Sequence, residues 1–265
     1  MRPKALILQA YGSNRDLDVL EALTLAGAEP SGVPLNELRE NKAMLSNCQL
    51  LVVPGGFSYA DALGAGKLLA LDLASYFADE LLAFVKAGKP VIGICNGFQA
   101  LVKSGMLPNT VSSMNEKVDS REGATLTFNA QGHFECRWVT LKPVSQNCLW
   151  TKGLDELVEC PVAHGEGNFQ ASDLFPLSTF IENDQIALSY VCADGAPAKG
   201  EYPINPNGSI LDIAGICNPQ GNVLGLMPHP ENHIHAHQHP QWTRGVNRHS
   251  GLAIFKNGVN HAKEM

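Results

Sequence analysis

The first 108 residues alternate between short apolar runs and segments with helical spacing, and this alternation restricts the fold more than any other feature. Apolar runs occupy residues 4–9, 50–56 and 90–95, and helical patterns occupy residues 16–27, 78–88 and 96–105. Continuous apolar runs are typical of strands buried on both faces. Strands separated by helices predict a parallel sheet with right-handed crossovers, and therefore a doubly wound α/β fold.

Local signals predict the ends and the buried face of the first helix. Asn14 is the candidate N-cap, and Gly27 is expected to end the helix. Helical spacing of leucines predicts the buried stripe, which would consist of Leu17, Leu20 and Leu23.

The second half of the chain is richer in strand signals. Short apolar runs are broken by turn residues at 134–141, 159–164, 186–191, 210–217 and 222–227. Asn-Pro-Gln-Gly at residues 218–221 is the best hairpin turn among them. Since no repeat, low-complexity tract or linker-like composition interrupts the chain, we expect residues 1–265 to form a single domain with a strand-rich second half.

The sequence GICNG, residues 93–97, joins a predicted strand to a predicted helix through a cysteine flanked by two glycines. This pattern is a cysteine version of the nucleophile elbow. A sharp turn exposes Cys95, and the start of a helix favours its thiolate form. The N–H of Asn96 and the glycine amides of the turn PGGFS, residues 54–58, at the same sheet edge are expected to bind an oxyanion. The alternative is a buried cysteine that only packs beside glycines.

The sequence MPHPE, residues 227–231, supplies the expected base. Pro230 keeps His229 out of the helical region, so we expect the segment to run extended. In an extended chain residues two apart face the same side, which places Glu231 where it can orient the imidazole. A cysteine with a carboxylate-oriented histidine is a triad for acyl transfer.

The other six cysteines and the histidine run at residues 233–239 are expected to carry no chemistry. Seven cysteines without CxxC spacing disfavour both a disulfide framework and a zinc knuckle, so the six besides Cys95 are expected to be buried thiols. The run HIHAHQH, residues 233–239, has alternating imidazoles but no carboxylate or cysteine in register. We therefore expect no metal site there, and a loop that faces solvent or a partner.

Charge and hydropathy exclude two classes of partner. The net charge of −7 argues against a general nucleic-acid binder, which needs clustered Lys and Arg. No run approaches the roughly 20 apolar residues of a membrane span, and the apolar run at the start is too short for a signal peptide. We expect a cytoplasmic protein that contacts neither nucleic acid nor membrane.

Several motifs together resemble a known family. GGFS (55–58), GICNGFQ (93–99) and MPHPE (227–231) resemble the class I (triad) glutamine amidotransferases. AHGEG (163–167) and NPNGS (205–209) extend the similarity to one branch of that family, the glutaminase subunits of phosphoribosylformylglycinamidine synthases of purine biosynthesis. The matching segments span most of the chain in the family's order. The resemblance implies a flavodoxin-like class I amidotransferase fold.

The resemblance also implies residue roles. Cys95 would be the nucleophile, His229 the general acid and base, and Glu231 the residue that orients it. Oxyanion and glutamine contacts would come from Gly56, Asn96, Gln99 and His164. Departures from the family's pattern occur at Ala60, Gly64, Asn168 and Asn232. They leave the triad intact but put in doubt the surfaces that face substrate or partner.

The resemblance implies glutamine as substrate and a large synthetase subunit as partner, with or without a small third subunit. The partner would use ATP and Mg²⁺ to convert formylglycinamide ribonucleotide to its amidine with the released ammonia. This chain has neither GxGxxG nor GxxxxGK[ST], so we expect no cofactor in this subunit and ATP on the synthetase. Two alternatives remain open, a cysteine hydrolase of related fold and a catalytically silent regulatory subunit.

Overall fold

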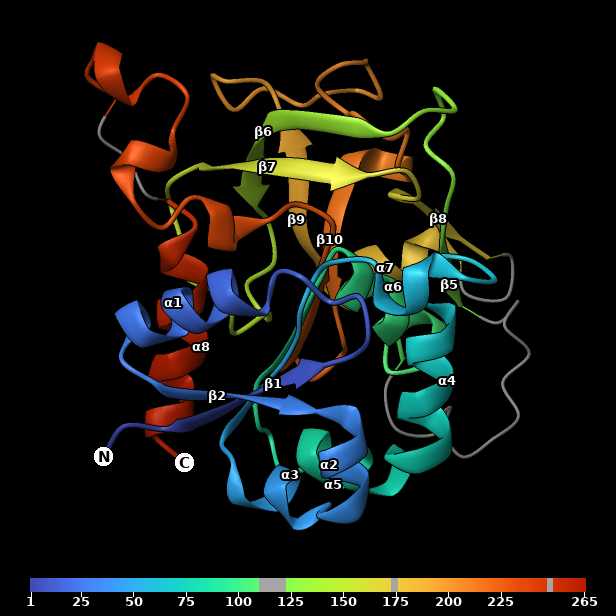
Figure 1. Cartoon of the computed structure of the whole chain (residues 1–265). Coiled ribbons are helices and arrows are strands. Elements are labelled where there is room, and N and C mark those ends of the chain that lie inside the picture. The colour runs from blue at the N-terminus through green and yellow to red at the C-terminus, as the bar shows by residue number, and fades with distance from the viewer. Residues whose placement is uncertain (110–122, 173–175, 247–249) are drawn as a thin grey trace.

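The computed structural model describes residues 1–109, 123–172, 176–246 and 250–265, and most of its strands belong to one sheet (Figure 1). The strands of this sheet are β1 (Lys4–Gln9), β2 (Glu29–Pro34), β3 (Leu50–Val53), β4 (Val91–Ile94), β6 (Glu135–Pro143), β7 (Val158–His164), β9 (Ile186–Val191), β10 (Ile213–Cys217) and β11 (Val223–Leu226). A separate antiparallel pair is formed by β5 (Ala124–Thr127) and β8 (Asn168–Ala171).

The helices are α1 (Asp16–Ala26), α2 (Leu35–Glu40), α3 (Ala43–Asn47), α4 (Lys67–Tyr76), α5 (Ala78–Lys86), α6 (Asn96–Lys103), α7 (Leu177–Glu182) and α8 (Leu252–Lys263). Short 3-10 turns are η1 (Ser58–Asp61), η2 (Ile210–Asp212), η3 (Pro230–Asn232), η4 (Ala236–Gln238) and η5 (Trp242–Arg244). In Figure 1, α1 and α8 lie together on one side of the sheet, and α4 and α6 lie on the other.

The sheet has a parallel half and an antiparallel half. Its order is β2-β1-β3-β4-β11-β10-β9-β6-β7, and the pairs from β2 to β11 are parallel. The pairs from β11 to β7 are antiparallel. The predicted doubly wound α/β fold is confirmed, as is the hairpin at residues 218–221, which joins β10 to β11. Both halves belong to one sheet.

The first helix differs from its prediction at two points. Its N-cap is Arg15 rather than Asn14, and no side chain caps it. Leu17 is 73% exposed, so its place in the buried stripe is wrong, whereas Leu23 is fully buried and Leu20 packs against the core while partly buried. Val19 belongs to the buried face as well. The face that packs is set by contact with α8, which lies far along the chain and which local spacing does not reveal.

Strand β2 and helix α4 carried no clear local signal. EPSGVP contains one valine and two prolines, and it forms a strand because it pairs with β1 at the edge of the sheet. The predicted ends of the other strands are confirmed to within a few residues. Among the described residues no helix is both long enough and apolar enough to cross a bilayer.

Candidate active site

Cys95 occupies the predicted turn between β4 and α6, in a backbone conformation that residues other than glycine rarely adopt. Its φ is 50° and its ψ is −107°. A Cβ atom at Gly97 would overlap the carbonyl oxygen of Val53, and one at Gly93 would lie 2.5 Å from Leu101 Cδ1. Glycines therefore flank the cysteine because the first turn of α6 packs directly on the ends of two strands.

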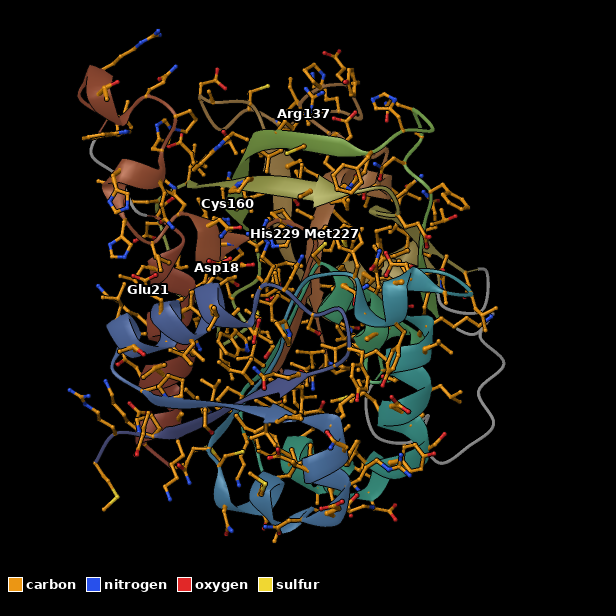
Figure 2. The ribbon with its side chains drawn as sticks, viewed as in Figure 1. Asp18, Glu21, Arg137, Cys160, Met227 and His229 are labelled. Atoms are coloured by element: carbon orange, nitrogen blue, oxygen red, sulfur yellow. The ribbon has the colours of Figure 1, made fainter. Side chains whose placement is uncertain are left out.

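Parallel pairing of β4 with β11 brings the histidine to the cysteine. Ile94 pairs with Leu226, whose carbonyl accepts a hydrogen bond from the Cys95 N–H at 2.8 Å. The chain continues from Leu226 into Met227 and His229, which are labelled near the middle of the molecule in Figure 2. The carboxyl ends of neighbouring parallel strands meet at one sheet edge, and ligands of α/β sheets bind there.

Strand β7 forms a wall of the site. The carbonyl oxygen of Pro161 accepts a hydrogen bond from the N–H of His229 at 2.8 Å. The carbonyl oxygen of Ala163 lies 3.7 Å from Cys95 Sγ. Cys95 is only 5% exposed, so its sulfur is enclosed by main-chain and side-chain groups on several sides.

Glu231 binds His229, but not through the extended geometry that we expected. Nδ1 of His229 lies 2.7 Å from Oε1 of Glu231, and both side chains are almost completely buried. The strand β11 ends at Leu226, the chain bends at Met227 and Pro228, and Pro230 begins the 3-10 turn η3. A proline suits the first position of a helical turn because its φ is already correct and its missing N–H is not needed there. The tight turn, rather than strand alternation, returns the carboxylate to the imidazole.

The neighbours of His229 favour its protonated form. Burial works to lower its pKa, but the charge of Glu231, the sulfur of Cys95 and hydrogen bonds to both groups outweigh burial and raise the pKa to about 10. The imidazolium stabilises negative charge on the sulfur beside it. The second carboxylate oxygen of Glu231, Oε2, is buried without a hydrogen-bond partner among the described residues.

The glycine turn after β3 lies against the histidine. A Cβ atom at Gly55 would lie 2.8 Å from Cε1 of His229, so only glycine leaves the ring in place. Gly56 forms an isolated antiparallel bridge with Ser13, held by a hydrogen bond from the N–H of Phe57 to the carbonyl of Gly12. In such a bridge the N–H of Gly56 points away from Ser13 and stays available to a ligand.

Asn96 and Gln99, on the first turns of α6, are engaged with protein groups. The Asn96 side chain accepts hydrogen bonds from the N–H (3.3 Å) and hydroxyl (2.5 Å) of Ser58, and it donates to Asp61 at 2.9 Å. The Gln99 amide donates to the carbonyl of Glu166 at 2.7 Å and accepts from Asn96 at 3.3 Å. Both side chains thus fasten neighbouring loops to the helix that carries Cys95.

His164 is a second buried histidine at the end of β7, and its charge state is opposite to that of His229. Burial and the nearby charge of His229 lower its pKa to about 4. Its Nδ1 lies 3.1 Å from Oδ1 of Asn129, whose amide nitrogen donates to the carbonyls of His133 and His164. Because the amide nitrogen of Asn129 is used elsewhere, its oxygen faces His164, and Nδ1 of His164 must be the donor. Nε2 of the neutral His164 ring is therefore an acceptor, and it has no partner in the part of the chain that the structure describes.

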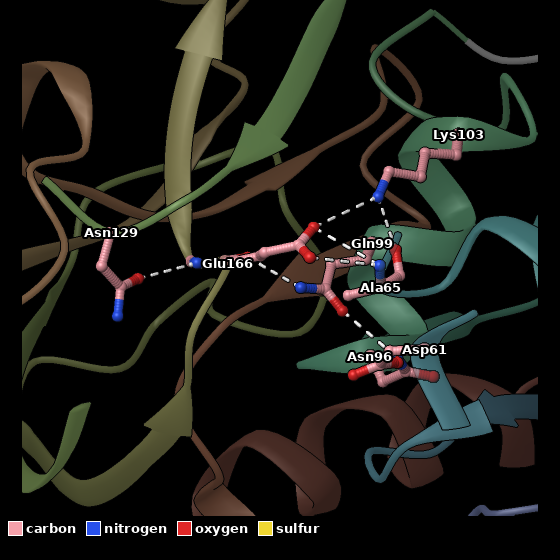
Figure 3. Close-up of polar contacts among 8 residues, drawn as sticks. Asp61, Ala65, Asn96, Gln99, Lys103, Asn129 and Glu166 are labelled. Atoms are coloured by element: carbon pink, nitrogen blue, oxygen red, sulfur yellow. Dashed lines mark hydrogen bonds and ion pairs between the residues drawn. The ribbon is translucent and has the colours of Figure 1, made fainter. Parts of the chain in front are cut away.

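Sequence reasoning missed a set of charged residues beside the site (Figure 3). Lys103 and Glu166 bind the main chain of Ala65, and Asp61 accepts a hydrogen bond from Asn96. Asn129 binds the loop that contains Glu166 through the N–H of Gly167. The AHGEG motif includes Glu166 and was the one available signal. Lys103 looked like an ordinary basic residue near the end of a helix.

The histidine run is only partly exposed, which corrects the expected loop. His233 is fully buried and His239 is 8% exposed; both rings contact Trp138 at centroid distances of 5.0 Å. His235 lies 2.8 Å from a carboxylate oxygen of Glu21. Among the described residues no three His, Cys, Asp or Glu side chains are grouped as metal ligands. His249 lies outside the described residues.

The cysteine prediction was also too simple. All seven thiols are free, but Cys136 is exposed and Cys192 is partly exposed. Both belong to the antiparallel half or its loops, where one face of a strand meets solvent. The other four non-catalytic thiols are buried, namely Cys48, Cys148, Cys160 and Cys217.

Comparison with known proteins agrees with this geometry. The profile of the CobB/CobQ-like glutamine amidotransferase domain matches residues 2–262. The chain belongs to this family. A PurQ subunit of phosphoribosylformylglycinamidine synthase from Treponema denticola is 52% identical over 98% of this chain and 99% of its own length. The PurQ subunit from Dehalococcoides mccartyi is 40% identical, with 99% of this chain and 98% of its own length covered.

Solved structures of two other proteins have a fold similar to that of this chain. A chain of PurLQS from Thermotoga maritima superposes with a TM-score of 0.71 at 31% identity, covering 98% of this chain and 99% of that chain. A glutamine amidotransferase from Thermotoga maritima is only 14% identical but has a TM-score of 0.54 over the full length of both chains. The second likeness supports the fold alone.

Proposed function

We propose that this chain is the glutaminase subunit of a phosphoribosylformylglycinamidine synthase in purine biosynthesis. The observation that carries the proposal is the buried triad, in which a protonated His229, fixed by Glu231, lies against the sulfur of an elbow cysteine. The PurQ relatives, which match this chain over nearly its whole length, supply the substrate class and the pathway.

The first half-reaction forms a thioester. The Cys95 sulfur attacks the side-chain carboxamide carbon of glutamine, and the carbonyl electron pair moves onto oxygen. The N–H groups of Gly56 and Asn96 hold that oxyanion, each contributing about 3 kcal/mol to lowering the barrier. When the C–N bond breaks, its electron pair stays on nitrogen, and the proton of His229 completes ammonia. The starting imidazolium suits this role because the proton is already present.

The second half-reaction releases glutamate. The neutral His229 left by the first step takes a proton from water, and the hydroxide attacks the γ-glutamyl thioester. The C–S bond breaks, sulfur leaves as thiolate, and His229 is again charged. Glu231 keeps the same ring nitrogen pointing at sulfur and water through both steps.

His164 and Gln99 are our candidates for glutamine contacts. The unpaired Nε2 of His164 accepts but cannot donate, so its complement is an N–H of the substrate. Gln99 contributes more indirectly, because its own amide holds the carbonyl of Glu166. Glutamine offers N–H groups at both its carboxamide and its ammonium ends.

The partner is a synthetase that receives the ammonia and that binds ATP and Mg²⁺, with or without a small third subunit, in the cytoplasm. Two exposed rings beside the site support a docking surface there. Phe57 and Phe134 are 47% and 49% exposed and stack at a centroid distance of 6.5 Å. Phe57 directly follows Gly56, and Phe134 lies beside Gly165. A partner that covers these rings also contacts both loops of the site.

Replacement of the nucleophile tests the proposal. Cys95→Ala is expected to abolish glutamine hydrolysis while the reconstituted complex still makes product from free ammonia, and Cys136→Ala is the matched control. Glutamate release and amidine formation are measured separately. Glutaminase activity near wild type in Cys95→Ala would refute the nucleophile, and absence of a thioester at Cys95 in the wild type would favour a silent subunit.

Dependence on the partner tests the pathway. We expect the isolated chain to hydrolyse glutamine slowly, and its synthetase with bound nucleotide and acceptor to accelerate hydrolysis at least about tenfold, because a displacement of 1 Å in an oxyanion donor costs on the order of 100-fold. The glycine-rich loop at residues 55–66 is the expected lever. Equal rates with and without the partner would instead favour a freestanding hydrolase.

A further inference from the structure

The loop that follows the oxyanion glycines has an unusual backbone. Tyr59, Ala60, Asp61 and Leu63 all have positive φ angles between 53° and 65°. Residues other than glycine adopt this conformation rarely and singly, because the Cβ atom crowds the backbone. A group of them within one loop persists only when contacts from outside the loop hold it in place.

The start of this loop is held by Asn96, as described above. Its end is held by a pair of opposite charges, Lys103 and Glu166, whose nearest atoms are 3.8 Å apart (Figure 3). The Lys103 ammonium donates to the carbonyl oxygen of Ala65 at 2.5 Å. The N–H of Ala65 donates to both carboxylate oxygens of Glu166 at 3.4 Å. One residue of the loop is therefore bound through both of its main-chain groups.

The charge pair joins three elements that surround the sulfur. Lys103 is the last residue of α6, whose first turn follows Cys95. Glu166 follows β7, which contributes the carbonyl of Ala163 to the sulfur. The loop reaches α6 without any gap, because a Cβ atom at Gly66 would lie 2.8 Å from the N atom of Ala100. Movement of the loop end is thus movement relative to the nucleophile.

We propose that Lys103 and Glu166 are a positioning pair that sets the oxyanion loop relative to Cys95. This inference rests on the proposed glutaminase function. The pair touches neither sulfur nor imidazole; it acts through Ala65 on the strained loop, and so on the N–H of Gly56. Because it acts on the oxyanion donor, its loss slows turnover and leaves glutamine binding in place. Gln99 remains bound throughout, since it contacts the main-chain carbonyl of Glu166.

Two single variants and their combination test the pair in the isolated full-length chain. Lys103→Met is expected to lower kcat about 10- to 100-fold, and Glu166→Gln somewhat less, because a glutamine oxygen still accepts from Ala65. KM stays within about threefold, and the double variant falls no further than Lys103→Met, as expected for residues that act as a unit. Lys103→Arg, which keeps the charge, restores most of the rate.

A second measurement separates positioning from a general collapse of the site. Alkylation of Cys95 by iodoacetamide needs the sulfur but no oxyanion donor, so its rate is expected to match wild type in both variants. The alkylation is followed by mass spectrometry of the peptide that contains Cys95, because the other six thiols are also free and can react. Glu80→Gln, on helix α5 and away from the site, is the control. It breaks the ion pair between Glu80 and Lys42, whose nearest atoms are 3.0 Å apart.

Two results would overturn the proposal that Lys103 and Glu166 position the loop. One is a kcat within twofold of wild type in Lys103→Met and Glu166→Gln; the other is a parallel loss of kcat, alkylation and thermal stability, which marks the pair as merely structural. Variants that fail to fold count with the second result. If the wild type hydrolyses glutamine and Cys95→Ala does not, these results reject the positioning role of Lys103 and Glu166 and leave the proposed glutaminase function standing. If the wild type is inactive, the proposed function fails first.

Discussion

Two buried histidines, at the ends of β11 and β7, have nearly the same local surroundings and opposite protonation. His229 and His164 are each 3% exposed, and each has an oxygen acceptor close to Nδ1. The acceptor of His229 is the carboxylate of Glu231, whereas that of His164 is the amide oxygen of Asn129. The pKa of His229 is raised to about 10 and that of His164 is lowered to about 4.

The difference shows that burial does not decide the charge of a histidine. Desolvation lowers the pKa in both places, and only a negative partner reverses its effect. The first charge also disfavours a second, since His229 helps to lower the pKa of His164. One site thereby favours an imidazolium at one position and a neutral imidazole, whose Nε2 can only accept, at the other.

Removal of each ring gives the largest expected contrast. His229→Asn is expected to reduce kcat by about 1,000-fold or more, because proton donation to ammonia and activation of water are both lost. His164→Asn is expected to raise KM several-fold and to lower kcat less than about tenfold. Steady-state glutamate release measures both. Similar losses of kcat in the two variants would mean that the histidines share the proton transfer.

Exchange of the acceptors tests the cause of the contrast. Glu231→Gln is expected to lower kcat on the order of 100-fold or more, with a smaller effect on KM, and to lower the pKa of His229 from about 10, because the charge of Glu231 is the largest of the contributions that raise it. Asn129→Asp is expected to raise the pKa of His164 above about 4, at a cost of roughly 1 kcal/mol in stability for each lost amide hydrogen bond. NMR titration of labelled imidazoles reads both values. Unchanged pKa values would show that the two acceptors do not cause the contrast.

Each ring also packs on a glycine, which allows a matched steric test. Gly55→Ala places a methyl group 2.8 Å from Cε1 of His229 and is expected to lower kcat about 10- to 100-fold by displacing the ring. Gly167→Ala places a methyl group 2.3 Å from Cε1 of His164. This variant is expected to lower stability and raise KM, with less effect on kcat. Thermal unfolding is measured beside the kinetics. A larger kcat loss in Gly167→Ala would reverse the assigned roles.

The smallest expected effect is on stability as a function of pH, where the two histidines act with opposite sign. A raised pKa means that His229 contributes stability fully below pH 6.5, and this contribution is lost as the pH rises toward about 10. A lowered pKa means that His164 costs stability as the pH falls from 6.5 toward about 4. Each slope is at most about 1.4 kcal/mol per pH unit.

Denaturant unfolding at several pH values measures these slopes. His229→Gln is expected to flatten the alkaline side of the stability curve, and His164→Gln the acid side. His237→Ala, on the exposed part of the histidine run, is the control and should leave both sides unchanged. A variant that flattens the wrong side would contradict the assigned protonation.

The sequence alone determined the strands β1, β3 and β4, the elbow at Cys95 and the pairing of His229 with Glu231, because each depends on residues a few positions apart. Apolar runs, flanking glycines and a histidine between prolines express local constraints on the backbone. Even the wrong geometry proposed for residues 229–231 led to the right pair, since only one carboxylate lies within reach of the histidine in that segment.

The tertiary structure decided what depends on residues far apart. The register of β4 against β11 brings His229 to Cys95, and the end of β7 adds His164 beside them. Lys103 and Glu166 meet only because α6 and the chain after β7 converge on one loop. Protonation belongs to this second group: a pKa is set by burial and by neighbouring charge, and both exist only once distant segments have packed together.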